Sequence, residues 1–350
     1  MLSLNQLNAQ LPGLEFIYGN TNDARILLQE YMRPYANIMG ANLNAGWYNT
    51  AKPHKLGGFD VTFTVSVAFA PTELLTYDLE QLDNLTADVQ ANGASSMAPT
   101  VAGDMETKPS LLYSQIKGTS GLPGDYELRI PHPNGTGINF LPMPMGQATI
   151  GLFKGTDVTL RYIPEMRLGD YGEIGLFGLG GKHSISQWIP VLKRLKFINL
   201  SVQGGYTKIG TSAHLNLDPN VDIPMADPPT DFDDQFLKLD LSGWTVNLIA
   251  SQSIPVITVY EGIGYSNSAA ELAMLGHYPR TVLIDEVGDD FGKTTYEVVE
   301  DPIEALTYEN NNNLRLNAGI RFKLGVLTIH YDFTKTLYAT HSAGIGISFR

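Results

Sequence analysis

The chain has 350 residues, no cysteine and a net charge of −13, and only 17% of its residues are charged, against about 25% in an average soluble domain. The lack of cysteine excludes disulfide-stapled folds and thiolate metal centres. The surplus of 36 acidic over 23 basic residues argues against a nucleic-acid-binding face, so we expect no nucleic-acid partner.

The first 56 residues have helical rather than alternating spacing. Asn20-Thr21-Asn22-Asp23 offers helix N-cap residues, and apolar residues then recur three and four positions apart. Pro34 is expected to end this helix and to start a second one that reaches Gly40, followed by an irregular segment at 46–54. We therefore expect a helical segment at 1–56 and a separate main domain at 57–350.

No stretch of the chain is suited to a membrane-spanning helix, which needs roughly 20 apolar residues in a row. The charge-free stretch 130–153 contains four prolines, and the stretch 241–260 is rich in Ser, Asn and Gln and contains Pro255. The first residues also lack the basic start and apolar core of a signal peptide, so we expect a chain whose signal has been removed or a cytoplasmic one.

From Phe59 onward, apolar and polar residues alternate with a period of two, as in strands with two different faces. The alternating segments are 59–69, 75–79, 126–130, 146–153, 157–162, 172–184, 198–203, 237–248, 256–265, 314–324, 327–334 and 342–349. Many are long, and their polar faces are rich in Ser, Thr, Asn, Gln and Gly rather than in charges. This pattern is typical of a transmembrane antiparallel β-barrel, here of about 14 strands, and a large soluble all-β sandwich or barrel is the alternative.

Within one strand the alternation changes phase. Leu237, Leu239 and Leu241 have one parity, whereas Trp244 and Val246 have the other. The switch falls at Ser242-Gly243, so we predict a β-bulge at the glycine.

Three polar or acidic segments are predicted to be long external loops, at 83–108, 217–234 and 269–309. None has the spacing of a calcium-binding loop, so we interpret them as solvated acidic loops and expect no metal site.

The closing residues Tyr338–Arg350 resemble the C-terminal signal strand of bacterial outer-membrane proteins, with Phe349 as the penultimate residue. The order of parts resembles the long-chain fatty-acid transporter class, in which an N-terminal segment plugs the barrel. Asn49-Thr50-Ala51 stands where many members of that class carry Asn-Pro-Ala, and the block from Gly46 to Phe59 is similar to a related, uncharacterised family of Gram-negative outer-membrane barrels. The resemblance implies the bacterial outer membrane, with residues 1–56 as a plug in the lumen, a cap over its end or a docking helix in the periplasm.

The polar faces carry a few residues of the types found in hydrolase sites. His330 and Asp332 share one strand face, and His341-Ser342 opens the next strand. The sequence has no Gly-x-Ser-x-Gly elbow, no phosphate-binding loop and no His-Glu-x-x-His pair. We therefore expect no enzyme and no cofactor, with a barrel lipid hydrolase as the weakest alternative.

The leading functional hypothesis is passive uptake of a small hydrophobic or amphipathic molecule, which would make a hydrophobic ligand or detergent a partner besides outer-membrane lipid. The candidate ligand contacts, which otherwise pack the plug against the wall, are Leu27, Leu28, Tyr31, Tyr35, Trp47 and Tyr48. The alternative is a non-transporting subunit that docks onto other outer-membrane proteins. In that case the lumen would be closed by charge pairs between the acidic Asp60, Asp78 and Glu80 and the basic Arg315, Arg321 and Lys323.

Overall fold

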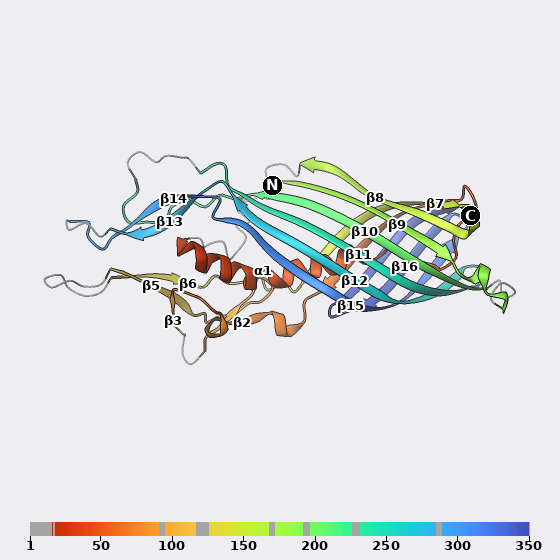
Figure 1. Cartoon of the computed structure of the whole chain (residues 1–350), viewed down its shortest axis with the longest axis horizontal. Helices are drawn as coiled ribbons and strands as arrows, with labels where there is room; N and C mark the ends of the chain where they lie inside the picture. The colour runs from red at the N-terminus through yellow and green to blue at the C-terminus, as the bar shows by residue number, and fades with distance from the viewer. Residues whose placement is uncertain are drawn as a thin grey trace, which may run out of the picture.

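A computed structural model describes residues 16, 18–90, 95–116, 126–167, 172–191, 197–225, 232–284 and 289–349. Their architecture is a closed antiparallel β-barrel with one long helix at one end, alongside the extended strands, and with smaller sheets beyond that end (Figure 1). The all-β class and the antiparallel barrel are confirmed.

The barrel wall has ten strands in this part of the chain, fewer than the predicted number. In chain order they are β1 (Phe59–Phe69), β7 (Phe140–Leu152), β8 (Thr156–Arg167), β9 (Glu173–Ser184), β10 (Ile198–His214), β11 (Phe236–Ser253), β12 (Ile257–Leu275), β15 (Ile303–Leu324), β16 (Leu327–Lys335) and β17 (Ala339–Phe349). The last strand closes the barrel by pairing with the first, and Phe59 lies opposite Phe349 with their rings stacked.

The helix α1 (Thr21–Leu43) is a single element, so the predicted break at Pro34 is wrong. Asn20 caps it by accepting a hydrogen bond from the backbone N–H of Asn22 at 2.8 Å, as expected for this residue type. A proline removes one helical hydrogen bond, but Leu27, Leu28 and Tyr31 are buried against the rest of the molecule and hold the helix together. None of the described helices is long and apolar enough to span a membrane.

The two ends of the barrel differ in the length of their connections. At one end the connections are short, with 153–155 containing the 3₁₀ turn η4 (Phe153–Gly155), then 254–256 and 325–326, while 185–197 is longer and contains η6 (Ser186–Trp188). At the other end the connections at 70–139, 215–235 and 276–302 are long. In outer-membrane barrels the short turns lie in the periplasm. By that convention we call the end with long connections the outer or upper end and the end with short turns the inner or lower end.

The long connections fold into small sheets of their own, on the left of Figure 1. They are β2 (Thr76–Asp78) with β4 (Met97–Pro99), β3 (Asp88–Gln90) with β5 (Ser110–Ile116) and β6 (Tyr126–Pro131), and β13 (His277–Leu283) with β14 (Thr294–Glu300). The 3₁₀ turns η2 (Thr72–Leu74) and η3 (Leu79–Gln81) flank β2.

These sheets explain the lower strand count. The alternating segments at 75–79 and 126–130 belong to them and not to the wall, because the chain leaves the barrel after β1 and returns only at Phe140. Conversely, the predicted loop at 269–309 is partly wall, since β12 continues to Leu275 and β15 begins at Ile303.

The phase change in β11 is not a bulge, because its pairing with β10 and β12 runs without a register shift. Leu237 and Leu241 point inward and are buried near α1, whereas Trp244, Val246 and Leu248 point outward and are 40–49% exposed. The apolar face therefore changes sides where the strand leaves the membrane and its inward face begins to pack on the helix.

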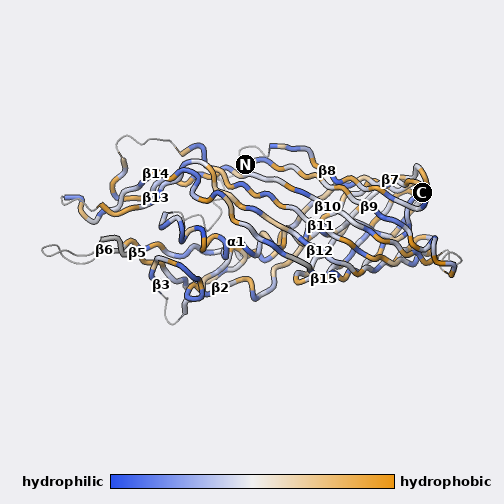
Figure 2. Tube along the Cα trace, in the orientation of Figure 1, coloured by the Kyte–Doolittle hydropathy of each residue, from blue (hydrophilic) through white to orange (hydrophobic). Residues whose placement is uncertain are grey.

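Outward-facing apolar side chains surround the part of the barrel nearer the short turns, on the right of Figure 2. The alternation of apolar and polar residues is visible along the strands in the same figure. This apolar belt has aromatic residues at its upper level, as membrane barrels do. They are Tyr162, Phe177, Tyr206, Trp244 and Tyr265. The low charge content of the chain thus has its cause in the wall, where charged side chains facing lipid are costly.

Candidate functional site: the plugged lumen

The interior of the barrel has two halves of different chemistry. In the outer half, apolar wall residues such as Leu176, Ile209 and Leu241 form one core cluster with Leu27 and Leu43 of α1. In the inner half the wall presents buried polar side chains to the segment that follows α1. This plug segment, residues 44–58, runs through the inner half and leads into β1.

Two wall arginines receive the plug segment where the helix ends. Arg161 on β8 donates to the carbonyl oxygens of Leu43 and Ala45 at 2.9 and 2.7 Å. Arg315 on β15 donates to the carbonyl oxygen of Asn44 at 2.8 Å. The end of a helix leaves carbonyls without intrahelical partners and carries partial negative charge. The arginines therefore satisfy the groups that the helix end leaves free.

Trp47 is held between an arginine and two glycines. The guanidinium of Arg161 lies 3.7 Å from the centre of its ring, a cation–π contact. A Cβ atom added at Gly180 on β9 or Gly205 on β10 would come within 2.5 Å of the indole. Glycine at these two wall positions is therefore required by the close approach of Trp47.

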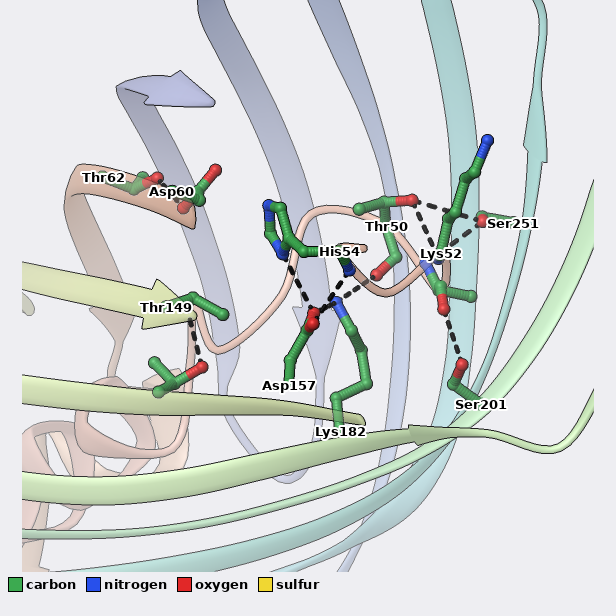
Figure 3. A network of polar contacts seen from close by, with 12 residues as sticks. Thr50, Lys52, His54, Asp60, Thr62, Thr149, Asp157, Lys182, Ser201 and Ser251 are labelled. Atoms are coloured by element: carbon green, nitrogen blue, oxygen red, sulfur yellow. Dashed lines mark hydrogen bonds and ion pairs between the residues drawn. The ribbon is translucent and has the colours of Figure 1, made fainter. Parts of the chain in front are cut away.

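Further along the plug segment, the wall binds the backbone of residues 50–54 (Figure 3). Asp157 on β8 accepts from the backbone N–H of His54 at 2.8 Å, and its other oxygen lies 3.0 Å from Lys182 Nζ on β9. Lys182 in turn donates to the carbonyl of Thr50 at 3.3 Å. The carboxylate and the ammonium are both buried, so they compensate one another while each holds the plug segment.

Ala51 is fixed from two other strands. Ser201 on β10 donates to its carbonyl oxygen at 2.5 Å, and its N–H donates to Ser251 Oγ on β11 at 3.1 Å. The side chain of Ala51 is fully buried. Because four neighbouring strands bind this short stretch, displacing it would leave several buried polar groups unpaired, which is costly.

Little space remains in the inner half. One cavity of about 20 Å³ lies among Trp47, Tyr48, Asp60, Lys182 and Gln203, enough for about one water molecule. A hydrophobic solute that followed the lumen to the end with short turns would have to displace the plug segment from the side chains that bind it.

Four of the six residues predicted to balance charge in the lumen lie on wall strands, and the other two lie outside the barrel. Asp60 on β1 lies 3.8 Å from Arg321 on β15, both buried, and Arg315 binds the plug segment as described. Lys323 lies at the end of β15 beside the turn at 325–326.

The placement of Asp78 and Glu80 corrects that prediction. They lie outside the barrel, where Asp78 is the N-cap of η3 and accepts from the backbone N–H of Glu80 at 3.1 Å. Their segment alternates like a strand, but it belongs to an external sheet.

The predicted ligand contacts are placed on α1 and the plug segment. Leu27, Leu28 and Tyr31 are buried in the outer core, and Tyr31 donates to the carbonyl of Asn134 at 2.7 Å. Tyr35 is partly buried, with its hydroxyl 2.7 Å from that of Thr136. Tyr48 packs edge-on against Tyr260 in the wall. Their contacts are with the protein itself, and a ligand-binding role for them stays a prediction.

The histidine and serine on the polar faces of β16 and β17 contact wall hydroxyls. Ser342 Oγ lies 3.0 Å from Ser66 Oγ on β1, and His330 Nε2 lies 3.4 Å from Thr64 Oγ1. Neither arrangement places a base on the serine, as nucleophilic catalysis would need.

The wall also contains a seam that the sequence pattern did not reveal. β7 and β8 pair only from Gln147–Arg161 to Leu152–Thr156, whereas β7 continues along β1 to Phe140 and β8 continues along β9 to Arg167. Residues 140–146 and 162–167 therefore have no strand partner on the sides that face one another. We call this opening of the ladder the seam.

Prolines coincide with the seam. The backbone groups of Asn139 and Gly151 bond toward β1, so the even positions between them face β8. Pro142 and Pro144 occupy two of these even positions, and a proline has no N–H to donate. In the sequence these prolines argue against a helix, and within a strand they are also the signal of an unpaired edge.

Two histidines in the external part have shifted pKa values of opposite sign. His132 is buried, which lowers its pKa to about 4, and its ring nitrogens lie 2.8 Å from the hydroxyl of Tyr77 and 2.7 Å from the carbonyl of Pro133. His277 is exposed, and its hydrogen bond to Asp234 raises its pKa. As the pH falls, His277 is therefore protonated before His132.

A family model covering residues 1–349 matches the chain, and its description is a family of unknown function, DUF6588. The chain belongs to this family. No curated protein matches the sequence.

Solved structures of bacterial membrane barrels are similar at low identity. The β domain of the Bordetella autotransporter BrkA is 10% identical, covers 84% of this chain and 99% of its own, and has a TM-score of 0.24. The Ralstonia pickettii toluene transporter TbuX is 8% identical over 84% of this chain and 90% of its own, with a TM-score of 0.20. The Pseudomonas putida toluene transporter TodX is 8% identical over 91% and 96%, with a TM-score of 0.15. At these scores the likeness carries no argument about function.

Proposed function

We propose that this protein is an outer-membrane transporter that takes up a small hydrophobic or amphipathic molecule and releases it sideways, through the seam between β7 and β8. The observation that carries the proposal is the seam itself, which opens the wall in the outer half while the plug segment fills the inner half. A molecule that enters from outside would then pass into the membrane without crossing the inner half of the lumen.

The depth of the seam supports this route. On β1 the outward-facing residues are apolar from Phe59 to Phe69, and β7 pairs with β1 along this whole length. Continuing the register beyond Gln147–Arg161 brings Gly146 opposite Tyr162, so the seam begins at the upper aromatic level of the belt and runs outward from there past Pro144 and Pro142. An opening that begins at this level would connect the barrel interior with the outer edge of the apolar belt.

The side chains behind the seam suit a hydrophobic solute. Met143 and Met145 of β7 point inward and belong to the same core cluster as Leu176 of β9, with Ile163 of β8 packed against it. Methionine adapts its shape to different neighbours at low cost. A flexible apolar lining next to an unpaired edge is what passive release of a hydrophobic molecule requires.

The absence of cysteine allows a direct test. Continuing the register by two residues beyond Gln147–Arg161 brings Met145 opposite Ile163. A Met145→Cys/Ile163→Cys variant linked by a reducible bifunctional thiol reagent should lose transfer of a fluorescent fatty acid from solution into the bilayer of reconstituted vesicles, and reductant should restore it. Unchanged transfer in the linked protein would contradict the proposal.

The matched control is a pair of cysteines where the strands already pair. Thr149 and Thr159 lie opposite one another, with their hydroxyls 2.8 Å apart. Linking Thr149→Cys/Thr159→Cys should leave transfer unchanged, because no opening exists there to close. Loss of transfer in both linked proteins would indicate a general effect of the reagent.

The filled inner lumen also favours the second candidate, a barrel subunit that does not transport. The plug segment is held by buried hydrogen bonds from several strands, which a purely structural barrel would retain permanently. A subunit of this kind should show no fatty-acid transfer in the unlinked wild-type protein, and it should co-purify with a partner in fixed ratio from mild detergent.

A further inference from the structure

The apolar belt of the wall carries one acidic side chain among the described residues. Glu261 lies on β12 between Val259 and Ile263, which point outward and are 56% and 50% exposed. Tyr260 beside it points inward and is buried, so the parity places the carboxylate of Glu261 on the lipid side. Among the described residues Glu261 has neither a hydrogen bond nor an ion pair.

The depth of Glu261 makes this position expensive. It lies four residues from Ile257 at the short-turn end of β12 and four from Tyr265 at the upper aromatic level. At about 3.4 Å per residue and a tilt of about 45°, either boundary of the belt is about 10 Å away in depth. A glutamate side chain is too short to reach water from there, unlike the long side chains that extend to the interface.

The strands on both sides present small side chains to Glu261. Ala250 of β11 and Ala318 of β15 are its direct register partners and share its outward face. Elsewhere on these strands the outward residues are large, such as Leu248 and Leu316. Glu261 therefore lies in a shallow notch, and small residues are what allow a second membrane-embedded surface to approach closely.

We propose that this notch, formed by Ala250, Glu261 and Ala318, is a docking site within the membrane for a different membrane protein. The partner would present a lysine or arginine side chain to Glu261 at mid-depth. The charge argues for this occupant, because an ionisable group facing lipid is retained where it meets a partner of opposite charge. The inference does not depend on transport.

A second copy of this chain does not fit the notch. A two-fold contact would bring two Glu261 carboxylates together, and like charges repel. The outward basic residues of the described wall, such as Lys208 and Lys335, lie at or above the upper aromatic level, so they cannot meet Glu261 at mid-depth.

Photocrosslinking in native membranes tests the proposal. A photoreactive residue at Ala250 or Ala318 should give one discrete adduct with another protein. The same residue at Val61 on β1 or Ile150 on β7, on the far side of the barrel, should not. The adduct should disappear in a Glu261→Leu background, and the crosslinked surface of the partner should contain a lysine or arginine whose replacement also removes it.

The matched control is Gln252→Leu, which removes another exposed polar side chain near the short-turn end of β11 and should leave the adduct intact. The isolated Glu261→Leu variant should fold and melt in detergent at the wild-type temperature or above, because a leucine suits the belt better. An adduct that survives Glu261→Leu, one formed only with a second copy, or labelling of lipid alone would overturn the proposal.

Discussion

At the residue scale, Trp47 of the plug segment lies in close contact with glycines of the wall strands β9 and β10. Its indole occupies the space that side chains at Gly180 and Gly205 would fill, while Arg161 covers its other face. A large rigid side chain in a closely packed interior adjusts poorly to added atoms. The glycines therefore decide whether the plug segment can lie where it does.

Gly205→Ala should destabilise the barrel by about 1–3 kcal/mol, the usual cost of an extra methyl group in a filled interior. Thermal unfolding in detergent, followed by the loss of heat-modifiable migration, would measure it. Gly204→Ala is the matched control, because the nearest atom to its added methyl group is 3.8 Å away. A similar loss at both positions would show that strand flexibility matters, and not the fit of Trp47.

Arg161 makes two of the hydrogen bonds that hold the end of α1 and the start of the plug segment. Arg161→Met should lower stability by about 3 kcal/mol or more, since each hydrogen bond to a charged group contributes about 1.5–3 kcal/mol and two plug carbonyls would stay buried without partners. The loss should be much smaller in a background that lacks residues 1–56. An equal loss in both backgrounds would place the role of Arg161 in the wall alone.

The lowered pKa of His132 predicts how the stability of the external part changes with acid. Its folded-state pKa of about 4 lies below the value of about 6.5 for a free histidine, so the unfolded chain binds a proton first. Stability should be complete above pH 6.5 and should fall as the pH drops toward 4, by about 1.4 kcal/mol per unit. Amide exchange of β6 against pH would measure this, and in His132→Phe the slope between pH 4 and 6.5 should flatten.

At the scale of elements, the seam shows how composition controls pairing. β7 has normal pairing on its β1 side along its full length, but its other side pairs with β8 only below Arg161. Prolines at an edge prevent a strand from completing its ladder. The opening is therefore a property of the strand sequence and does not need a bound molecule to create it.

Replacing both prolines should close the seam. In Pro142→Val/Pro144→Val the strand regains two N–H donors that face β8, and we expect slower amide exchange at 140–146 and reduced fatty-acid transfer. Pro255→Val, in the turn between β11 and β12, is the control that should change neither. If amide exchange slows but fatty-acid transfer stays at the wild-type rate, the seam is not the route of uptake.

Much of the wall could be predicted from the alternation, because one face of each strand meets lipid and the other meets polar groups. The alternation gives wrong predictions where that contrast between the two faces is absent. In β11 the inward face is apolar near α1, so the parity of Leu237 and Leu241 led to the wrong prediction of a bulge. The external strand at 126–131 alternates as wall strands do, and only its sheet partners distinguish it.

The candidate site was less accessible from sequence. Trp47 and Tyr48 were identified from their residue type, but their partners Arg161, Gly180 and Gly262 lie far away in the chain. Asp157 and Lys182 were missed, because each alone reads as a polar residue on a strand. Strand register decides which of these meet, and a single sequence does not contain it.

At the scale of the whole molecule, the barrel combines a closed inner lumen with an open upper wall. The few charges of the wall interior are used to hold the plug segment, as in the buried pair of Asp157 and Lys182. The acidic surplus of the chain is concentrated in the external connections. The plug segment therefore lies across the route that ions and water-soluble molecules would take through the described lumen.

Planar-bilayer recording of the reconstituted protein tests this closure most directly. The wild-type protein should show no steady single-channel conductance, because the plug segment is bound across the inner half and the cavity beside Trp47 holds only about one water molecule. Arg161→Met/Arg315→Met, which releases the end of α1 from the wall, should introduce conductance steps. Stable, ohmic conductance in the wild-type protein would contradict a sealed lumen, and with it the need for a sideways route.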